Sequence, residues 1–351
     1  MRVGMPLSYS ASGFRRTVEE LVDYERVGLD VVWLPEAYTF DSVSQLGYLA
    51  AKTTTVGIGS GILNVYSRTP TLLAMTAAGL DAVSEGRFTL GLGASGPQVV
   101  EGFHGIRYDN PLGRSREVVE ICRSVWRREK VDAHGRFYDI PLTPERGGSG
   151  LGKPLKLINT PLRADIPVVL AALGPKNVAL AAELFEGWEP IFYYPERAAE
   201  AFGAALADGT AKRSAALPPL EVYADTHVAV TDSPEEEDAA LAKVRAHLAL
   251  YVGGMGAKGK NFYNDLAVRY GFADAAEKVQ ELFLSGRKDE AAAAVPEELA
   301  RGVALIGSEA VVKERVEAFR AAGVSVLNAH PLAATHEQRV RDVGVLKGLT
   351  A

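Results

Sequence analysis

The chain has 351 residues, of which 47% are hydrophobic and 23% are charged, and its formal net charge is −6. This composition is typical of a globular protein with a substantial core, and the absence of a concentrated basic stretch argues against nucleic acid or a membrane surface as partner. A single cysteine, Cys122, excludes an internal disulfide framework and a cysteine-rich metal site. Because no apolar run is long enough to cross a bilayer or to act as a leader, we expect a cytoplasmic protein.

Short apolar runs alternate with amphipathic stretches along most of the chain. An early helix carries Val18, Leu21 and Val22 on its apolar face, and a later one begins at the cap Ser308. The predicted strands are residues 2–6, 31–34, 54–62, 87–90, 167–171, 189–192, 221–230 and 324–328. Each strand except the last is followed by a predicted helix. Eight such units predict a (β/α)8 TIM barrel, and a doubly wound open sheet is the alternative.

Two stretches interrupt this alternation. Residues 131–140 read as a hairpin and residues 143–153 as a loop rich in glycine and proline. Residues 233–300 are mainly helical and longer than one crossover requires. We therefore expect a single TIM-barrel domain over residues 1–351, with a hairpin and loop insertion near 130–165 and a helical insertion near 233–300.

The corner after the fifth predicted strand is a candidate anion site. Gly174-Pro175 ends the strand, and Pro175 suits the first position of the following helix. The free N–H groups of that helix, its dipole and Lys176 favour an anion, most simply a phosphate. An ordinary strand-to-helix corner is the alternative at this point.

Glycines mark two further strand ends. Residues 91–96 match the spelling G-x-G-x-x-G, but the prolines and glycines that follow prevent the helix of a dinucleotide-binding unit. We interpret this segment as a loop that lets a flat ligand approach the backbone. Gly57, Gly59 and Gly61 lie along the third strand, where glycine marks either a bulge, a close approach of the backbone, or tight packing against a neighbour.

Five polar residues follow barrel strands, where the chemistry of a TIM barrel is placed. Glu36 offers a carboxylate at the mouth or a salt-bridged residue of the rim. His104 either transfers a proton to substrate or stabilises its loop. Asn64 and Tyr66 either bind a ligand or hold their loop, and His330 is a weaker candidate. We expect no metal site, because H-E-x-x-H, C-x-x-C and neighbouring histidines are all missing from the sequence.

The sequence also resembles a known family over essentially its whole length. Gly61-Ile62 near Asn64, Tyr66 and Arg68, followed by residues 84–88 and 91–93, is similar to the luciferase-like monooxygenase superfamily. Residues 171–177, 181–183 and 187–188 resemble its deazaflavin-using branch, typified by methylene-tetrahydromethanopterin reductase.

This resemblance implies a barrel that holds coenzyme F420, or alternatively FMN, at the carboxyl ends of its strands. It places a non-proline cis peptide and a bulge behind the cofactor ring at Gly61-Ile62, and it matches Glu36 to the family's acidic residue after the second strand. The candidate catalytic residues are Glu36, through this match, and His104, through its place after the fourth strand. The implied cofactor-binding residues are Gly61, Ile62, Asn64, Ser95, Gly96, Ala172, Gly174, Pro175, Lys176, Asn177, Gly187 and Trp188.

Two departures from the family pattern narrow the implied reaction. Relatives that oxidise sugar phosphates have a histidine after the second-strand acid and a glutamate in the fourth-strand turn, where this chain has Ala37 and Gly96-Pro97. The resemblance therefore implies hydride transfer between reduced F420 and a small organic substrate, with C=C or C=N reduction favoured. An FMN-dependent monooxygenase and a non-catalytic ligand-binding barrel are the alternatives. Family analogy also implies a homodimer or a larger assembly.

Overall fold

The computed structural model describes residues 1–8, 13–256 and 258–351, and within these residues eight parallel strands close into a barrel. The strands are joined in the order β1-β2-β3-β5-β8-β9-β10-β12, and β12 pairs with β1 to close the ring. They are β1 (Arg2–Pro6), β2 (Val31–Leu34), β3 (Gly57–Ser60), β5 (Phe88–Gly93), β8 (Val168–Ala171), β9 (Gly187–Glu189), β10 (Glu221–Val230) and β12 (Val326–Pro331). The predicted (β/α)8 TIM barrel is confirmed, and the open sheet is excluded.

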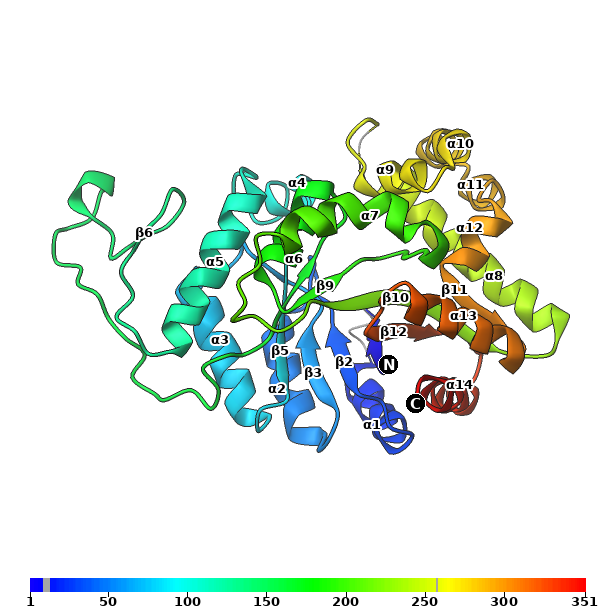
Figure 1. Cartoon of the computed structure of the whole chain (residues 1–351), viewed down its shortest axis with the longest axis horizontal. Helices are drawn as coiled ribbons and strands as arrows, with labels where there is room; N and C mark the ends of the chain where they lie inside the picture. Colours follow the sequence, from blue (N-terminus) through cyan, green and yellow to red (C-terminus); the bar gives the residue numbers. More distant parts are fainter. Residues whose placement is uncertain (9–12, 257) are drawn as a thin grey trace.

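Helices cover the outside of the barrel, as Figure 1 shows. Those up to the seventh barrel strand are α1 (Phe14–Arg26), α2 (Ser42–Lys52), α3 (Pro70–Val83), α4 (Pro97–Val100), α5 (Pro111–Trp126), α6 (Pro175–Leu184) and α7 (Pro195–Thr210). Those after it are α8 (Pro234–Ala249), α9 (Phe262–Arg269), α10 (Ala273–Leu284), α11 (Lys288–Ala293), α12 (Glu297–Gly302), α13 (Glu309–Ala321) and α14 (His336–Thr350). The Ser308 side chain accepts a hydrogen bond from the Val311 amide, so the predicted cap of α13 is confirmed.

The predicted third strand is shorter than expected at its start. The carboxylate of Glu25 accepts hydrogen bonds from the amides of Thr54, Thr55 and Val56, so these residues form a turn instead of joining the sheet. The strand then continues in two pieces, β3 and β4 (Leu63–Asn64), both of which pair with β5.

The predicted sixth strand is displaced along the sequence. Residues 189–192 were expected to form it, whereas β9 comprises Gly187–Glu189. Pro190 has no N–H to donate to a ladder, and its carbonyl instead accepts a hydrogen bond from Asp225 at 3.3 Å. Glu189 therefore lies at the carboxyl end of the strand, not at its start.

Three segments extend beyond the simple barrel. A hairpin pairs β6 (Ala133–His134) with β7 (Asp139–Ile140), within the predicted hairpin of residues 131–140, and projects to the left in Figure 1. Helices α8 to α12, with the π-helical turn η3 (Leu250–Gly254), lie together at the other side. The sequence analysis missed β11 (Ala304–Gly307), which pairs with the far half of β10 outside the closed ring. In the described part of the chain, no helix combines the length and apolar character needed to cross a bilayer.

Two separate sets of buried side chains form the core. The larger lies between the sheet and the surrounding helices. The smaller fills the barrel interior and consists of Val31, Trp33, Val169, Tyr223 and Val326. Because side chains alternate along a strand, the residues two positions further on also point inward, toward the carboxyl ends of the strands. The inner core therefore forms the floor of any site at the barrel mouth.

Candidate functional site

Trp33 forms the centre of this floor. Its ring meets Tyr223 edge-on, with ring centroids 5.5 Å apart, and its indole N–H donates to Asn328 Oδ1 at 2.9 Å. A Cβ atom on Gly59 would lie 2.4 Å from the Trp33 ring, and one on Gly61 would lie 3.1 Å from Trp33 Cβ. The glycines of the third strand therefore make room for a protein side chain, which is the tight-packing alternative of the sequence analysis.

The third strand bulges directly above Trp33. Gly59 pairs with Thr89 and Leu63 with Leu92, so four steps along this strand face three steps along β5. The peptide between Gly61 and Ile62, inside the bulge, is cis. The bulge and the cis peptide lie at Gly61-Ile62, which is where the family resemblance places them.

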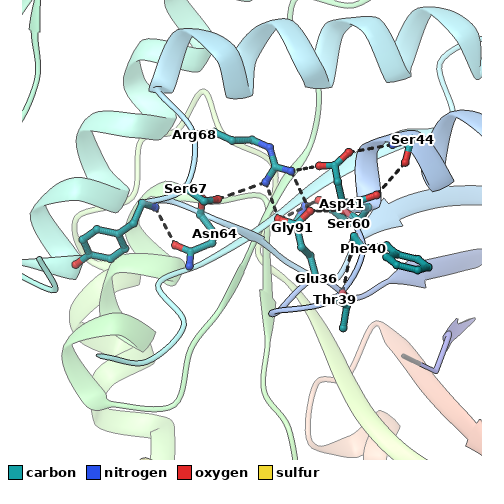
Figure 2. A network of polar contacts seen from close by, with 12 residues as sticks. Glu36, Thr39, Phe40, Asp41, Ser44, Ser60, Asn64, Ser67, Arg68 and Gly91 are labelled. Carbon is teal, nitrogen blue, oxygen red and sulfur yellow. Dashed lines mark hydrogen bonds and ion pairs between the residues drawn. The ribbon is translucent and has the colours of Figure 1, made fainter. Parts of the chain in front are cut away.

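Glu36 is held in an ion pair at the rim. Its Oε1 and Oε2 accept hydrogen bonds from Arg68 at 2.6 and 2.9 Å (Figure 2). Ser42 donates to Oε2 through its amide and its hydroxyl. Arg68 also pairs with Asp41. Burial alone would raise the pKa of the Glu36 carboxyl, but the hydrogen bonds from Arg68 and Ser42 outweigh burial and hold that pKa below its usual range. The ionised, fully bonded carboxylate fits the alternative of a salt-bridged rim residue, and it holds no proton to donate.

Asn64 and Tyr66 bond mainly to their own neighbourhood. The Asn64 side chain accepts from the Tyr66 amide at 2.8 Å, and the Tyr66 hydroxyl donates to the Asp109 carbonyl at 2.8 Å. The guanidinium of Arg114 lies over the Tyr66 ring. These contacts favour the loop-structural reading of both residues.

The loop after β5 places three predicted residues on one side of the mouth. Ser95 is exposed and has a positive φ of 56°, while Gly96 is half-buried and precedes α4. The His104 ring meets the Phe103 ring edge-on at 5.3 Å, and Phe103 in turn contacts Tyr38 from the loop after β2. The His104 ring makes no hydrogen bond within the described residues, so its role as a proton donor stays a proposal.

The corner between β8 and α6 is open. Gly174 precedes α6 as its cap residue, and a Cβ placed on it would meet no atom within 4 Å. Pro175 and Lys176 are exposed, and Asn177 is half-buried. The amides of Asn177 and Val178 donate to the Gly174 carbonyl, so the helix end offers fewer free donors than the sequence suggests.

A second cation approaches this corner from α9. Arg269 donates to the Leu173 carbonyl at 2.9 Å and to the Ala201 carbonyl at 2.8 Å. Its sequence surroundings contain no motif, so sequence reasoning missed it. Lys176 and Arg269 together fit an anionic group better than the helix end does alone.

Three predicted cofactor-binding residues, Ala172, Gly187 and Trp188, are enclosed by protein. The Trp188 side chain is fully buried between sheet and helices, and its indole N–H donates to the Ala172 carbonyl at 2.8 Å. Ala172 is also buried. Gly187 begins β9 at the opposite end of the barrel and lies against Tyr223. The structure therefore brings neither Gly187 nor Trp188 to the mouth, because Gly187 starts β9 at the amino end of the barrel and the Trp188 side chain packs outside it.

Sequence reasoning also missed the acidic and imidazole groups inside the barrel. Glu189 was missed because the sixth strand was predicted to begin at residue 189, which placed Glu189 at the amino end of that strand, away from the mouth. Tyr223, Asp225 and His227 lie two positions apart along β10 and so share one face of the strand, which was a usable signal. His330, a weak candidate in the sequence, lies beside them, with Nε2 4.0 Å from Asp225 Oδ2.

Comparison with known proteins gives a consistent result. The family described as luciferase-like monooxygenase matches residues 1–325. A coenzyme F420-dependent oxidoreductase of Mycobacterium tuberculosis, so named by prediction, is 43% identical over 99% of both chains. The 5,10-methylenetetrahydromethanopterin reductase of Archaeoglobus fulgidus is 29% identical over 91% of both chains.

A solved structure shares the whole fold. The coenzyme F420-dependent tetrahydromethanopterin reductase of Methanopyrus kandleri superposes with a TM-score of 0.80 at 21% identity, covering 98% of this chain and 97% of that one. At this identity the superposition concerns the fold, and the sequence matches establish the family. The chain is an enzyme of the luciferase-like monooxygenase family.

Proposed function

We propose that this enzyme is an F420-dependent oxidoreductase that transfers a hydride between reduced deazaflavin and a small organic substrate. The observation that carries the proposal is the open corner at Gly174, with the exposed Lys176 two residues later and Arg269 bound to the carbonyl of the preceding Leu173. The names of the most similar relatives support F420 as the cofactor, because two of them are F420-dependent in name.

The proposed binding residues form two groups. Gly174, Pro175, Lys176 and Asn177, beside the buried Ala172, receive the anionic tail of the cofactor. Gly61, Ile62, Asn64, Ser95 and Gly96 lie near its ring, with the bulge of the third strand behind it. When bound, the deazaflavin supplies the hydride, and the chain contributes orientation and a site shielded from water.

The state of Glu36 favours reduction of an activated C=C or C=N bond over oxidation of a sugar phosphate. Its ionised carboxylate is committed to Arg68, and Ala37 and Gly96-Pro97 replace the acid and base groups that sugar-phosphate oxidation uses in relatives. A reduction of this kind needs a bound hydride donor and one proton, not a base at Glu36.

Cofactor titration tests this proposal. Purified protein is titrated with oxidised F420, reduced F420 and FMN, and each affinity is measured by fluorescence quenching or calorimetry. We expect F420 to bind more tightly than FMN. Tight FMN binding without F420 binding would refute the proposal.

An FMN-dependent monooxygenase is the second candidate, because the matching family is described as luciferase-like monooxygenase. This reaction consumes oxygen and needs a separate reductase to supply reduced flavin. Formation of an oxygenated product from reduced FMN, oxygen and an organic substrate, absent without the protein, would support it. The expected homodimer remains a prediction, which light scattering of the purified protein tests.

A further inference from the structure

Two carboxyl groups face the barrel interior from neighbouring strands. Glu189 ends β9, and Asp225 lies on β10, two positions after the interior residue Tyr223. Neither carboxyl group forms an ion pair with a lysine or arginine within residues 1–8, 13–256 and 258–351. The Oδ1 atom of Asp225 is buried and makes no hydrogen bond to any described residue. Two neighbouring carboxyl groups without a lysine or arginine beside them favour a state in which one of them keeps its proton.

Glu189 is the carboxyl group of this pair that keeps its proton. Burial and the negative charge of Asp225 raise the pKa of the Glu189 carboxyl well above its usual range, and the hydrogen bond from Asn328 offsets only part of this effect. A carboxyl group whose pKa is raised in this way keeps its proton to a higher pH than an ordinary glutamate does, as a general acid requires.

The hydrogen bonds also show which oxygen carries the proton. Asn328 Oδ1 accepts from the Trp33 indole, so the Asn328 amide must present Nδ2 to Glu189, where it donates to Oε1 at 3.1 Å. Because Oε1 is occupied as an acceptor, the proton of the acid resides on Oε2. This oxygen is free of Asn328 and available to another partner.

A ligand can approach this acid only from the carboxyl ends of the strands. Trp33 and Tyr223, below it, are 1% and 4% exposed, so the floor is sealed. Glu189, Asp225 and His330 all retain some exposure. The acid therefore faces the side of the barrel where the bulge and the Gly174 corner lie.

A row of imidazoles connects the carboxyl pair with the helical segment outside the barrel. His330 lies 4.0 Å from Asp225, the His330 and His227 ring centroids are 5.3 Å apart, and His227 Nε2 is 3.1 Å from His247 Nδ1. Burial and the neighbouring histidines lower the pKa values of His227 and His247, the latter to about 4. Both rings are therefore neutral near pH 7, with one nitrogen to donate and one to accept.

These histidines do not form a metal centre by geometry. In the described ranges, no group of three or more His, Cys, Asp or Glu side chains is arranged to hold a metal ion. A row of neutral imidazoles that ends at a carboxyl pair is instead suited to moving protons.

We propose that Glu189 is the general acid of the reaction and that Asp225, His330, His227 and His247 return its proton from solvent. This inference rests on the proposed function. The hydride supplied by the reduced deazaflavin forms a bond to one atom of the C=C or C=N group, and the π electron pair takes the Glu189 proton at the other atom. The substrate is reduced, the cofactor is oxidised, and Glu189 is left as a carboxylate that the relay protonates again.

The first test examines the protein without cofactor. Infrared spectra near neutral pH are compared between the wild type, Glu189→Gln and the matched control Glu221→Gln, whose carboxylate pairs with Arg2 at the other end of the barrel. We expect the wild-type spectrum minus that of Glu189→Gln to show a protonated carboxyl band. The same subtraction with Glu221→Gln should show a carboxylate band. A carboxylate band from Glu189 would overturn the proposal.

The second test measures turnover with reduced F420 and two probes, 2-cyclohexen-1-one and 2-methyl-1-pyrroline. We expect Glu189→Gln to lower kcat by about 100-fold while the affinity for F420 is unchanged, and Glu189→Asp to restore part of the rate. If Glu189→Gln turns over as fast as the wild type, Glu189 is not the general acid. That result would leave the proposed function itself standing. If the wild type neither binds F420 nor reduces either probe, the proposed function itself is wrong.

The relay is tested by pH dependence. His330→Ala should slow turnover at high pH, where protons are scarce, more than at low pH, and added imidazole should restore the rate. A loss of rate that is equal at every pH and insensitive to imidazole would show that His330 acts only through packing.

Discussion

Glu36 and Arg68 meet through two parallel hydrogen bonds, and their side chains are only 10% and 13% exposed. Glu36→Gln removes the charge but keeps the shape, and we expect it to lower the free energy of unfolding by about 1–3 kcal/mol, as measured by urea denaturation near neutral pH. The matched control is Glu129→Gln, because Glu129 pairs with Arg127 at the exposed surface, where solvent screens the pair, and its loss should change stability less.

The effect of Glu36→Gln should depend on pH in a defined direction. The pKa of Glu36 is lowered in the folded protein, so its contribution is present above the usual glutamate pKa of about 4.3 and is lost as the pH falls through the lowered value. The stability difference between wild type and Glu36→Gln should therefore shrink below about pH 4. A constant difference would contradict this ion pair.

Glu189 should show the opposite dependence. The pKa of its carboxyl is raised in the folded protein, so the wild type loses stability as the pH rises from about 4 through that raised value. The glutamine of Glu189→Gln cannot ionise. The melting temperature of this variant, relative to that of the wild type, should therefore increase as the pH rises. Thermal melts across the pH range measure this gain, and parallel curves would show that Glu189 is not protonated in the fold.

Lys176 should contribute to cofactor affinity without supporting the fold, because its side chain is exposed at the open corner. Lys176→Ala should raise the Kd for F420 about tenfold, the equivalent of one charge-assisted hydrogen bond. Lys313→Ala, the same change on exposed α13, is the control and should leave the Kd unchanged. An unaltered Kd in Lys176→Ala would refute the anion site, and Gly174→Val, which fills the same corner, should weaken binding as well.

Gly91 should tolerate no side chain. A Cβ there would lie 1.8 Å from the Ser60 carbonyl oxygen, so Gly91→Ala forces the backbone of β3 and β5 apart and should cost about 1–3 kcal/mol. Gly79, in α3, has no atom within 4 Å of an added Cβ, and Gly79→Ala should stabilise the protein by up to about 1 kcal/mol. Urea denaturation of both variants checks this contrast.

The barrel itself could be predicted because apolar runs and helix faces repeat with clear periods. The ends of the strands were harder to predict from the sequence. Residues 54–56 were lost from the third strand to a distant carboxylate, Glu25, and the sixth strand was displaced because Pro190 cannot join a ladder. These outcomes depend on partners that local sequence patterns do not reveal.

The site was predicted unevenly for the same reason. The corner at Gly174 lies in one continuous segment, so its local sequence was sufficient to predict that a strand gives way to a helix there, whereas the bulge at Gly61-Ile62 was expected from the family resemblance. Glu36 was a catalytic candidate because its partner Arg68 is 32 positions away, so the sequence did not show that the carboxylate is held in an ion pair. Glu189 and Asn328, separated by 139 positions, become neighbours only when the barrel closes.

The close fit between Trp33 and Gly59 has an evolutionary consequence. Neither residue can change alone, since a methyl group on Gly59 would collide with the indole and a smaller residue in place of Trp33 would leave a void. Among descendants of this lineage, the two positions should covary, with a larger residue at one accompanied by a smaller residue at the other. The inner surface of the barrel would then diverge by coupled exchanges and not by independent drift.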